Sequence, residues 1–385
     1  MADMETFDLP DSPDTKTPKQ RASDWRGRIA RALKRQKMWH PWWEEALKAY
    51  APSVKDDPTG YRNEVRTNRT FTIVERKSAE LFYQKPEITV SAAPLLEALG
   101  PQGAVICSAQ AAILNEALGT DGINSRSMAR RAIFDNLLFC LGATKMGVRV
   151  YTKDVPTETP VTDEFGQPVV DPLTGQPQTQ VDVVPVPIKT DVFWENMSPK
   201  QFLMPADWSG GDFDKAPWLG FTFSMSLQEA KRLYGEKIPA DFSGGDGKAE
   251  ERQFDTGDAP DKLPSQDLVG GTEIWYRTSQ FEDEAHPDHL TQIVLIDGIP
   301  EPVEDRPSPY QTFDAQGRLS PDSLIGYPIH PLMIRTLTDS AYAPSDVMIA
   351  IPGEQELNKF RTQMVQQRDA TILRYLFNTD ALPLE

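Results

Sequence analysis

The sequence DNLLFCLGATKMG, residues 135–147, changes from a helical pattern to a β pattern within one short stretch. Before it, apolar residues recur every four positions from Ala129 to Leu141, which predicts a helix. Gly142 is expected to cap that helix. After it, apolar and polar residues alternate through 144–151, as in a half-buried strand. The chain is therefore predicted to change from helical to β structure at this glycine.

The residues before this stretch predict an acidic arm followed by helices. Residues 1–23 contain five acids and almost no apolar side chains, which indicates a flexible arm. Farther along, apolar residues recur at helical spacing, and we expect 24–142 to be a helical region. The individual helices are predicted at residues 16–39, 41–50, 62–85, 103–119 and 125–141.

The residues after this stretch predict a β-rich region, 143–343, built from short strands. Alternating patterns at 272–280 and 290–296 predict an antiparallel pair of strands. Runs rich in Pro, Gly and Asp predict exposed loops at 154–190 and 239–271. We therefore expect an α+β fold with a helical N-terminal region, an antiparallel β-rich middle and a long C-terminal helix.

The longest predicted helix lies within residues 344–385 and runs on from Pro352-Gly353. One side of it is apolar, at Leu357, Phe360 and Met364. The given sequence ends soon after this helix. We therefore expect either that the sequence is a fragment or that this apolar side contacts another subunit.

The first predicted helix is strongly basic, with nine Lys or Arg and one Asp between residues 16 and 39. Three interpretations are open: a solvated face of a helix packed on its own chain, a contact with an acidic neighbouring subunit, and a contact with DNA phosphates. The side chains expected at a subunit contact are Arg26, Arg28, Arg31, Lys34 and Arg35.

The composition favours a soluble, structural protein over an exported protein or an enzyme. The net charge is −17, and no stretch approaches the ~20 apolar residues that cross a bilayer. The acidic N-terminus does not have the pattern of a secretion signal. Cys107 and Cys140 lie in apolar helical stretches, which suits reduced core thiols, and the chain has only four histidines.

Motifs that carry catalysis are missing from the sequence. It contains no P-loop, no G-x-G-x-x-G after a strand and no G-x-S-x-G. The spacing of Asp207, Asp212 and Asp214 fits ordinary turns better than a calcium or magnesium site, and His286-Pro287-Asp288-His289 fits a surface turn better than a zinc site. We therefore expect no catalytic residue, metal or cofactor; a metal-dependent hydrolase that uses the three aspartates is a remote alternative.

Four segments follow one another in an order shared with a known protein family. Arg66-Thr67-Asn68-Arg69 leads a helix that ends at Lys85-Pro86 and passes into a strand at Glu87-Ile88-Thr89-Val90. Residues 135–147 follow, and then residues 194–234, which contain W-x-x-F and S-x-x-E-A-K-R-x-Y. The last segment is Ala343-Pro344-Ser345-Asp346 with Glu354-Gln355-Glu356-Leu357-Asn358, although Ala343 stands where a glycine is common. This succession resembles the wing and first stem helix of tailed-bacteriophage portal proteins.

The resemblance implies a ring, usually of twelve copies, at one vertex of the capsid. Double-stranded DNA would pass through this head-to-tail connector during packaging and ejection, without sequence-specific binding. The implied partners are further copies of the chain, the major capsid and scaffolding proteins, the terminase large subunit, which hydrolyses the ATP, and tail adaptor proteins. The ring would assemble in the host cytoplasm, belong to the virion and need no membrane.

The resemblance also assigns parts of the chain to parts of the ring. Residues 344–385 match the first stem helix, so that the chain ends near the expected clip, and a second stem helix, tunnel loop and crown are expected outside the region of resemblance. The polar stem residues expected to face the channel are Gln363, Gln366, Gln367 and Arg368. The alternative to a portal is a DNA-binding adaptor that uses the basic helix, 16–39.

Overall fold

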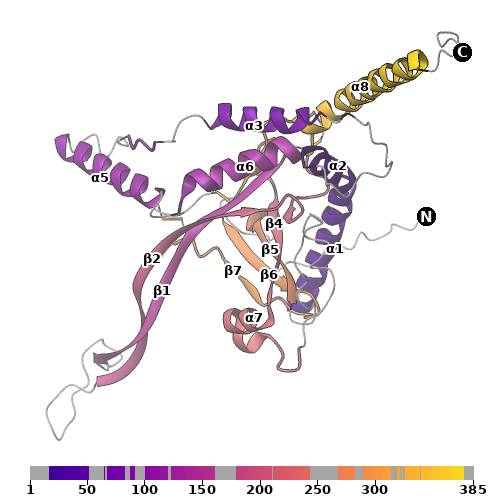
Figure 1. Ribbon diagram of the computed structural model, residues 1–385. Helices are drawn as coiled ribbons and strands as arrows, with labels where there is room; N and C mark the ends of the chain where they lie inside the picture. The colour runs from indigo at the N-terminus through magenta and orange to yellow at the C-terminus, as the bar shows by residue number, and fades with distance from the viewer. Residues whose placement is uncertain are drawn as a thin grey trace, which may run out of the picture. The chain divides into compact units, whose positions relative to one another are not determined.

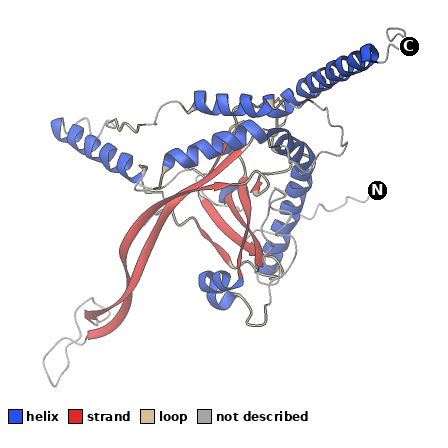
Figure 2. Ribbon diagram, viewed as in Figure 1, coloured by secondary structure: helices blue, strands red, loops and turns tan. Residues whose placement is uncertain are grey.

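The computed structural model divides the chain into two compact units. The first unit comprises residues 1–145 and 195–385, and the second comprises residues 146–194. Helices and antiparallel sheets make up an α+β fold with a long C-terminal helix, as predicted (Figure 1, Figure 2). The structure describes residues 17–51, 65, 67–82, 87–91, 100–119, 123–160, 179–209, 211–242, 268–281, 289–313, 319–320, 323, 326–338 and 340–376.

Helix α1 covers Pro18–Lys37, and a capping box between Thr17 and Gln20 fixes where it begins. The N–H of Gln20 donates to the Thr17 hydroxyl at 3.4 Å, and the N–H of Thr17 donates to Gln20 Oε1 at 2.9 Å. The predicted end of the acidic arm at residue 23 is therefore too late, because the helix already begins at residue 18. Residues 1–16 lie outside the described chain.

Helix α1 packs on one face of a five-stranded antiparallel sheet (Figure 1). The Trp25 ring centroid lies 4.8 Å from that of Tyr276 and meets Trp218 edge-on at 6.0 Å. The other buried positions of the helix follow the same helical spacing. In sheet order the strands are β3 (Phe202–Leu203), β4 (Trp218–Ser226), β5 (Leu268–Arg277), β6 (Leu290–Ile296) and β7 (Glu304–Pro307).

Alternation along β5 divides its apolar side chains between the two faces of the sheet. Tyr276 lies in the core with α1, whereas Trp275 lies in a second core that also contains Trp43 of α2 (His40–Tyr50). The predicted antiparallel pair of strands is confirmed as β5 and β6. Both faces of the sheet are therefore buried, one by a single helix and the other by a group of helices.

Helix α6 (Ser125–Phe139) passes into strand β1 (Gly142–Pro160) through a left-handed residue. Gly142 was expected to cap the helix, but Cys140 takes that role with a φ of 59°. The glycine is required for another reason, because a Cβ at Gly142 would lie 2.1 Å from the carbonyl oxygen of Ala132. The change from helix to strand thus depends on a close backbone contact. From Gly142, β1 pairs antiparallel with β8 (Ile329–Leu332).

Both predicted loops are shorter than expected. In the first loop, predicted at 154–190, strand β1 continues to Pro160 and strand β2 begins at Thr179. Strand β2 covers Thr179–Met197, and the sheet has the order β2-β1-β8. Within 239–271, β5 begins at Leu268. The parts of the two loops outside the described residues are 161–178 and 243–267.

The strand expected at residues 87–91 does not form, because a side chain replaces the strand partner. Asn115 Oδ1 accepts from the N–H of Ile88 at 2.9 Å, and Asn115 Nδ2 donates to the carbonyl of Ile88 at 2.9 Å. One side-chain amide therefore satisfies both backbone groups of this residue.

The C-terminal helix begins before Pro352, where the prediction placed its start. The hydroxyl of Ser345 accepts from the N–H three residues on, at 3.1 Å, and Val347 and Ile351 are buried in the second core. The remaining helices are α3 (Arg69–Leu81), α5 (Pro101–Ala117), α7 (Leu227–Tyr234) and α8 (Asp346–Leu376), with short 3-10 turns η2 (Phe213–Lys215), η3 (Gly235–Lys237) and η6 (Thr278–Gln280).

Replacement of Gly142 by alanine is expected to lower the free energy of unfolding by about 2 kcal/mol or more, since the added Cβ meets a backbone oxygen that has little room to move. The matched control is Gly27→Ala on α1, where no atom lies within 4 Å of the added Cβ. The control is expected to stabilise by ~0.5–1 kcal/mol through helix propensity. Urea unfolding measures both; equal stability of the two variants would contradict the close contact.

Candidate functional site

Helix α8 is fixed to the rest of its unit along one face. Glu354 Oε2 accepts from the N–H of Thr70 at 2.8 Å. Farther along the helix, Asn358 Oδ1 accepts from the N–H of Thr67 at 2.9 Å, and Arg361 donates to the Thr67 hydroxyl at 2.7 Å. These contacts orient the helix, because they lie on the same side over two turns.

A neighbouring side of α8, about a quarter turn from these contacts, carries the predicted apolar side chains, and most of it is exposed. Phe360 is 59% exposed and Met364 is 55% exposed, while Leu357 is half-buried. Beyond the contacts with the start of α3, no other described element covers this side (Figure 1). The polar side chains predicted to face a channel are exposed as well: Gln363, Gln366, Gln367 and Arg368.

Two of the predicted interface arginines bind their own chain. Arg26 donates to the main-chain oxygens of Ile299 and Pro300. Arg35 donates to the carbonyls of residues 205, 206 and 208 at 3.3, 2.6 and 2.8 Å. These contacts hold α1 on the sheet and fix the loop that follows β3.

The other three cations of the predicted set lie along the solvent side of α1. The guanidinium carbon of Arg28 lies 4.7 Å from the ring centroid of Trp25 and 4.4 Å from that of Phe281. Arg31 and Lys34 are exposed. The structure thus supports packing of this helix on its own chain, and it leaves Arg31 and Lys34 as the open part of its basic surface.

The three aspartates proposed as a remote catalytic alternative take ordinary structural roles. The Asp212 carboxylate accepts from the N–H of Asp214 and pairs with Lys215 at 3.0 Å, which lowers the pKa of Asp212. The carbonyl of Asp214 accepts from Arg277, and Asp207 is exposed. Within the described ranges, no group of three or more His, Cys, Asp or Glu side chains is placed to hold a metal ion.

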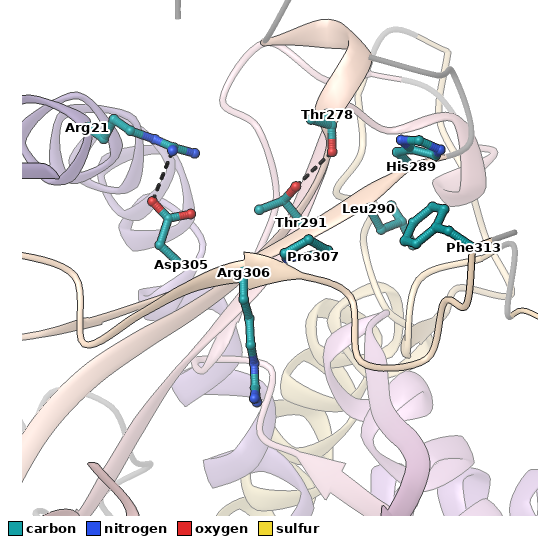
Figure 3. A pocket seen from close by; sticks show the side chains of 9 residues that line it. All are labelled: Arg21, Thr278, His289, Leu290, Thr291, Asp305, Arg306, Pro307 and Phe313. Carbon is teal, nitrogen blue, oxygen red and sulfur yellow. Dashed lines mark hydrogen bonds and ion pairs between the residues drawn. The ribbon is translucent and has the colours of Figure 1, made fainter. Parts of the chain in front are cut away.

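A cavity of about 350 Å³ lies between the start of α1 and strands β5 to β7 (Figure 3). Four of its polar side chains form two pairs. Arg21 forms an ion pair with Asp305 at 3.2 Å, and the hydroxyls of Thr278 and Thr291 lie 2.7 Å apart. The ion pair joins α1 to β7 and so contributes to the position of the helix.

Aromatic groups form the other end of this cavity. The His289 ring lies edge-on to Phe313, with 4.7 Å between ring centroids. Arg306 points away from the cavity in Figure 3, and its Nε lies 3.4 Å from Gln292 Oε1. His286, the other histidine of the predicted surface turn, lies outside the described residues. The arrangement therefore resembles packing around a crevice more than a set of converging reactive groups.

A buried polar cluster at the base of β1 was not predicted from the sequence. Glu273 Oε1 accepts from Lys145 Nζ at 2.7 Å, from Trp275 Nε1 at 2.7 Å and from Gln292 Nε2 at 3.2 Å. The Lys145 and Glu273 side chains are only 14% and 10% exposed. The sequence shows a single Glu in an alternating strand, and nothing near it in the chain indicates its lysine partner.

Burial changes the titration of three groups, two at helix α6 and one in strand β8. It raises the pKa of Asp135 to about 7, against the opposing effect of Arg131. It also raises the pKa of the Cys140 thiol and lowers that of His330. Cys107 and Cys140 are free and buried, as predicted.

Helix α5 exposes a second apolar surface, which was not predicted from the sequence. Val105 is 66% exposed and Ile113 is 65% exposed. Glu116 is the one charged residue in the sequence of this helix. The lack of charge over 101–115 is a signal that would have identified the surface, since exposed helices usually carry charges.

Comparison with known proteins gives no family or relative for this chain. No protein-family model matches it, and no curated protein is significantly similar in sequence. None of the helices in the described ranges is both long enough and apolar enough to cross a membrane.

Replacement of Lys145 by methionine is expected to lower the free energy of unfolding by ~2–4 kcal/mol, because the buried Glu273 carboxylate loses its cation. The double variant Lys145→Met with Glu273→Gln is expected to recover part of this loss, since it removes the buried charge as well. Urea unfolding of the two variants measures the difference. An equally large loss in the double variant would exclude the charge as its cause.

Replacement of Asp135 by asparagine is expected to stabilise the protein at pH 8 by ~1–2 kcal/mol, a value reduced for the partial exposure of the side chain. Because the folded pKa of Asp135 is raised, its ionisation disfavours the folded state as the pH rises from about 4 through 7. The gain should shrink toward about pH 3, where most of the carboxyl is protonated in both states. Thermal unfolding at both pH values measures it, with exposed Asp207→Asn as the control, and a gain independent of pH would contradict the assignment.

Proposed function

We propose that the chain is the wing and first stem-helix part of a tailed-bacteriophage portal protein. Copies of it form a ring at one capsid vertex, through which double-stranded DNA is packaged and ejected, and on which terminase and tail proteins dock. The observation that carries the proposal is the exposed apolar side of α8, at Phe360 and Met364. The resemblance assigns this helix to the stem.

Repetition of the chain around an axis supplies a cover for this apolar side. Burial of a Phe or Met side chain stabilises by ~1.5–3 kcal/mol, so two such residues per contact favour association. A head-to-tail contact repeated by rotation closes into a ring, in which every copy has the same neighbours. Helix α5 offers further apolar surface at Val105 and Ile113 for contacts of the same kind.

The charge of the chain suits a channel for DNA. The net charge is −17, and the exposed stem residues Gln363, Gln366 and Gln367 are uncharged. A duplex carries one negative charge per ~1.7 Å, so an acidic or neutral wall does not hold it tightly. Such a wall permits sliding, which packaging and ejection require.

The contacts of α1 favour this proposal over a DNA-binding adaptor. Phosphate contacts need arginine N–H groups that are free to donate, and Arg26 and Arg35 already donate to carbonyls of their own chain. Of the predicted set, Arg28, Arg31 and Lys34 remain for phosphate contacts, and three cations are a small surface for duplex binding because each phosphate contact contributes separately to affinity.

The particle mass of the purified chain tests the proposal. Mass photometry and negative-stain electron microscopy are expected to show closed rings. The double variant Phe360→Asp with Met364→Asp should shift the population to monomers, because charged side chains replace the apolar contact.

The matched control is Gln363→Asp, which introduces a charge on the same turns of α8 at an exposed polar position. It should leave the rings intact. Monomers of the wild-type chain at all concentrations would contradict the proposal, and so would equal loss of rings in the control and the double variant.

A further inference from the structure

A second cavity, of about 430 Å³, lies beside the C-terminal half of α1. Arg28 and Arg31 line it from the helix, and residues 205–207 line it from the loop after β3. Pro217-Trp218 and Gln280-Phe281 complete its walls. It is thus a pocket with cations on one side and proline and aromatic groups on the others.

Two aromatic rings hold the guanidinium of Arg28 in place. Its guanidinium lies over the rings of Trp25 and Phe281, at 4.7 and 4.4 Å. Stacking uses the face of a guanidinium and leaves the N–H groups at its edge to donate to an anion. Burial lowers the pKa of Arg28, which reflects the cost of partly desolvating its charge.

Neither cation of the pocket forms a direct ion pair with a carboxylate of the described chain. No ion pair or hydrogen bond joins Arg28 or Arg31 to an acidic side chain among the described residues. The charge of Asp24, one turn before Arg28 on α1, raises the pKa of Arg28 and so opposes part of the effect of burial. A partly desolvated guanidinium beside a second exposed one favours an incoming negative charge.

The opposite wall of the pocket is fixed in place. Arg35 donates to the carbonyls of residues 205, 206 and 208, which sets the backbone of the loop. Asp207 extends from this loop into the lining. Two guanidiniums and one carboxylate give the pocket one net positive charge, which matches a single carboxylate better than a dianionic phosphate.

We propose that this pocket binds an acidic and apolar peptide segment, and that the segment is residues 3–14 of a copy of this chain. A carboxylate of the segment would lie against Arg28 and Arg31, and a neighbouring apolar side chain against Phe281 and Trp218. This proposal does not depend on the proposed function.

The sequence of the segment has the required chemistry. Residues 3–14 read DMETFDLPDSPD, with five acids and with Phe7 and Leu9 beside them. The segment directly precedes α1, and Arg28 lies ten residues along that helix, or ~15 Å from its start. Sixteen residues can span up to ~50 Å, so the segment reaches the pocket from its own copy or from an adjacent one.

Binding of a labelled synthetic peptide, residues 3–14, tests the proposal by fluorescence anisotropy. The receptor is the full-length chain in which the five acids of its own segment are changed to the corresponding amides, so that they do not compete. The peptide is expected to bind this receptor. Binding to the chain with the intact segment should be weaker, because that segment occupies the pocket.

Single substitutions in the receptor locate the site. Arg31→Ala should weaken binding by about tenfold or more, because it removes a charge-assisted contact and the exposed side chain has no structural partner in the described chain. Lys34→Ala, an exposed cation on the next turn, should change binding less than about twofold. Circular dichroism confirms that both variants are folded.

Three results would overturn the proposal. The first is no binding of the peptide to the amide receptor. The second is equal weakening by Arg31→Ala and Lys34→Ala, which would indicate attraction by net charge alone. The third is equal binding to the receptors with and without the intact acidic segment, which would exclude this segment as the occupant.

Discussion

The carboxylate of Glu273 accepts three hydrogen bonds at one oxygen, from Lys145, Trp275 and Gln292. Lys145 lies at the base of β1, and the other two donors lie in the five-stranded sheet. Within the first unit, this buried cluster therefore joins the first residues of β1, where they pair with β8, to strands β5 and β6. A buried carboxylate is costly unless it is paired, so the cluster restricts where Lys145 lies on the five-stranded sheet.

The position of the five-stranded sheet also affects which apolar side chains of α8 and α5 stay exposed. With the five-stranded sheet fixed, α1 covers one face through Trp25, and α2, α6 and the start of α8 share a core with the other face. Lys77 of α3 pairs with Asp346 at 2.7 Å, which also fixes the start of α8. The apolar side chains farther along α8 and on α5 take part in neither core. They are the surfaces that a neighbouring copy would cover.

Much of the fold was predictable from local patterns. Helical spacing predicted α1, α2, α3, α5 and α6, and alternation predicted the pair β5 and β6, because both patterns reflect burial of one face. The errors have local causes. The C-cap of α6 is Cys140 rather than the predicted Gly142, because Gly142 is needed for the close contact with Ala132. Helix α8 begins before the predicted start at Pro352, because Val347 and Ile351 are buried in the core.

The candidate sites were less predictable, because they depend on residues far apart in the chain. The sequence identified the cations of α1 but not that Arg26 and Arg35 bind carbonyls more than a hundred residues away. It identified Phe360 and Met364 as one side of a helix, and their exposure agrees with that reading. The pocket beside Arg28 combines four separate segments, and no local pattern indicates such a combination.

The central claim is that the apolar side of α8 is covered by another copy of the chain. Hydrogen–deuterium exchange of residues 358–371, measured over a range of protein concentrations, tests it most directly. The account predicts that these amides become more protected as the concentration rises, while those of α1, buried on its own sheet, do not change. Exchange in α8 that is independent of concentration, in a particle with the mass of one chain, would contradict the account.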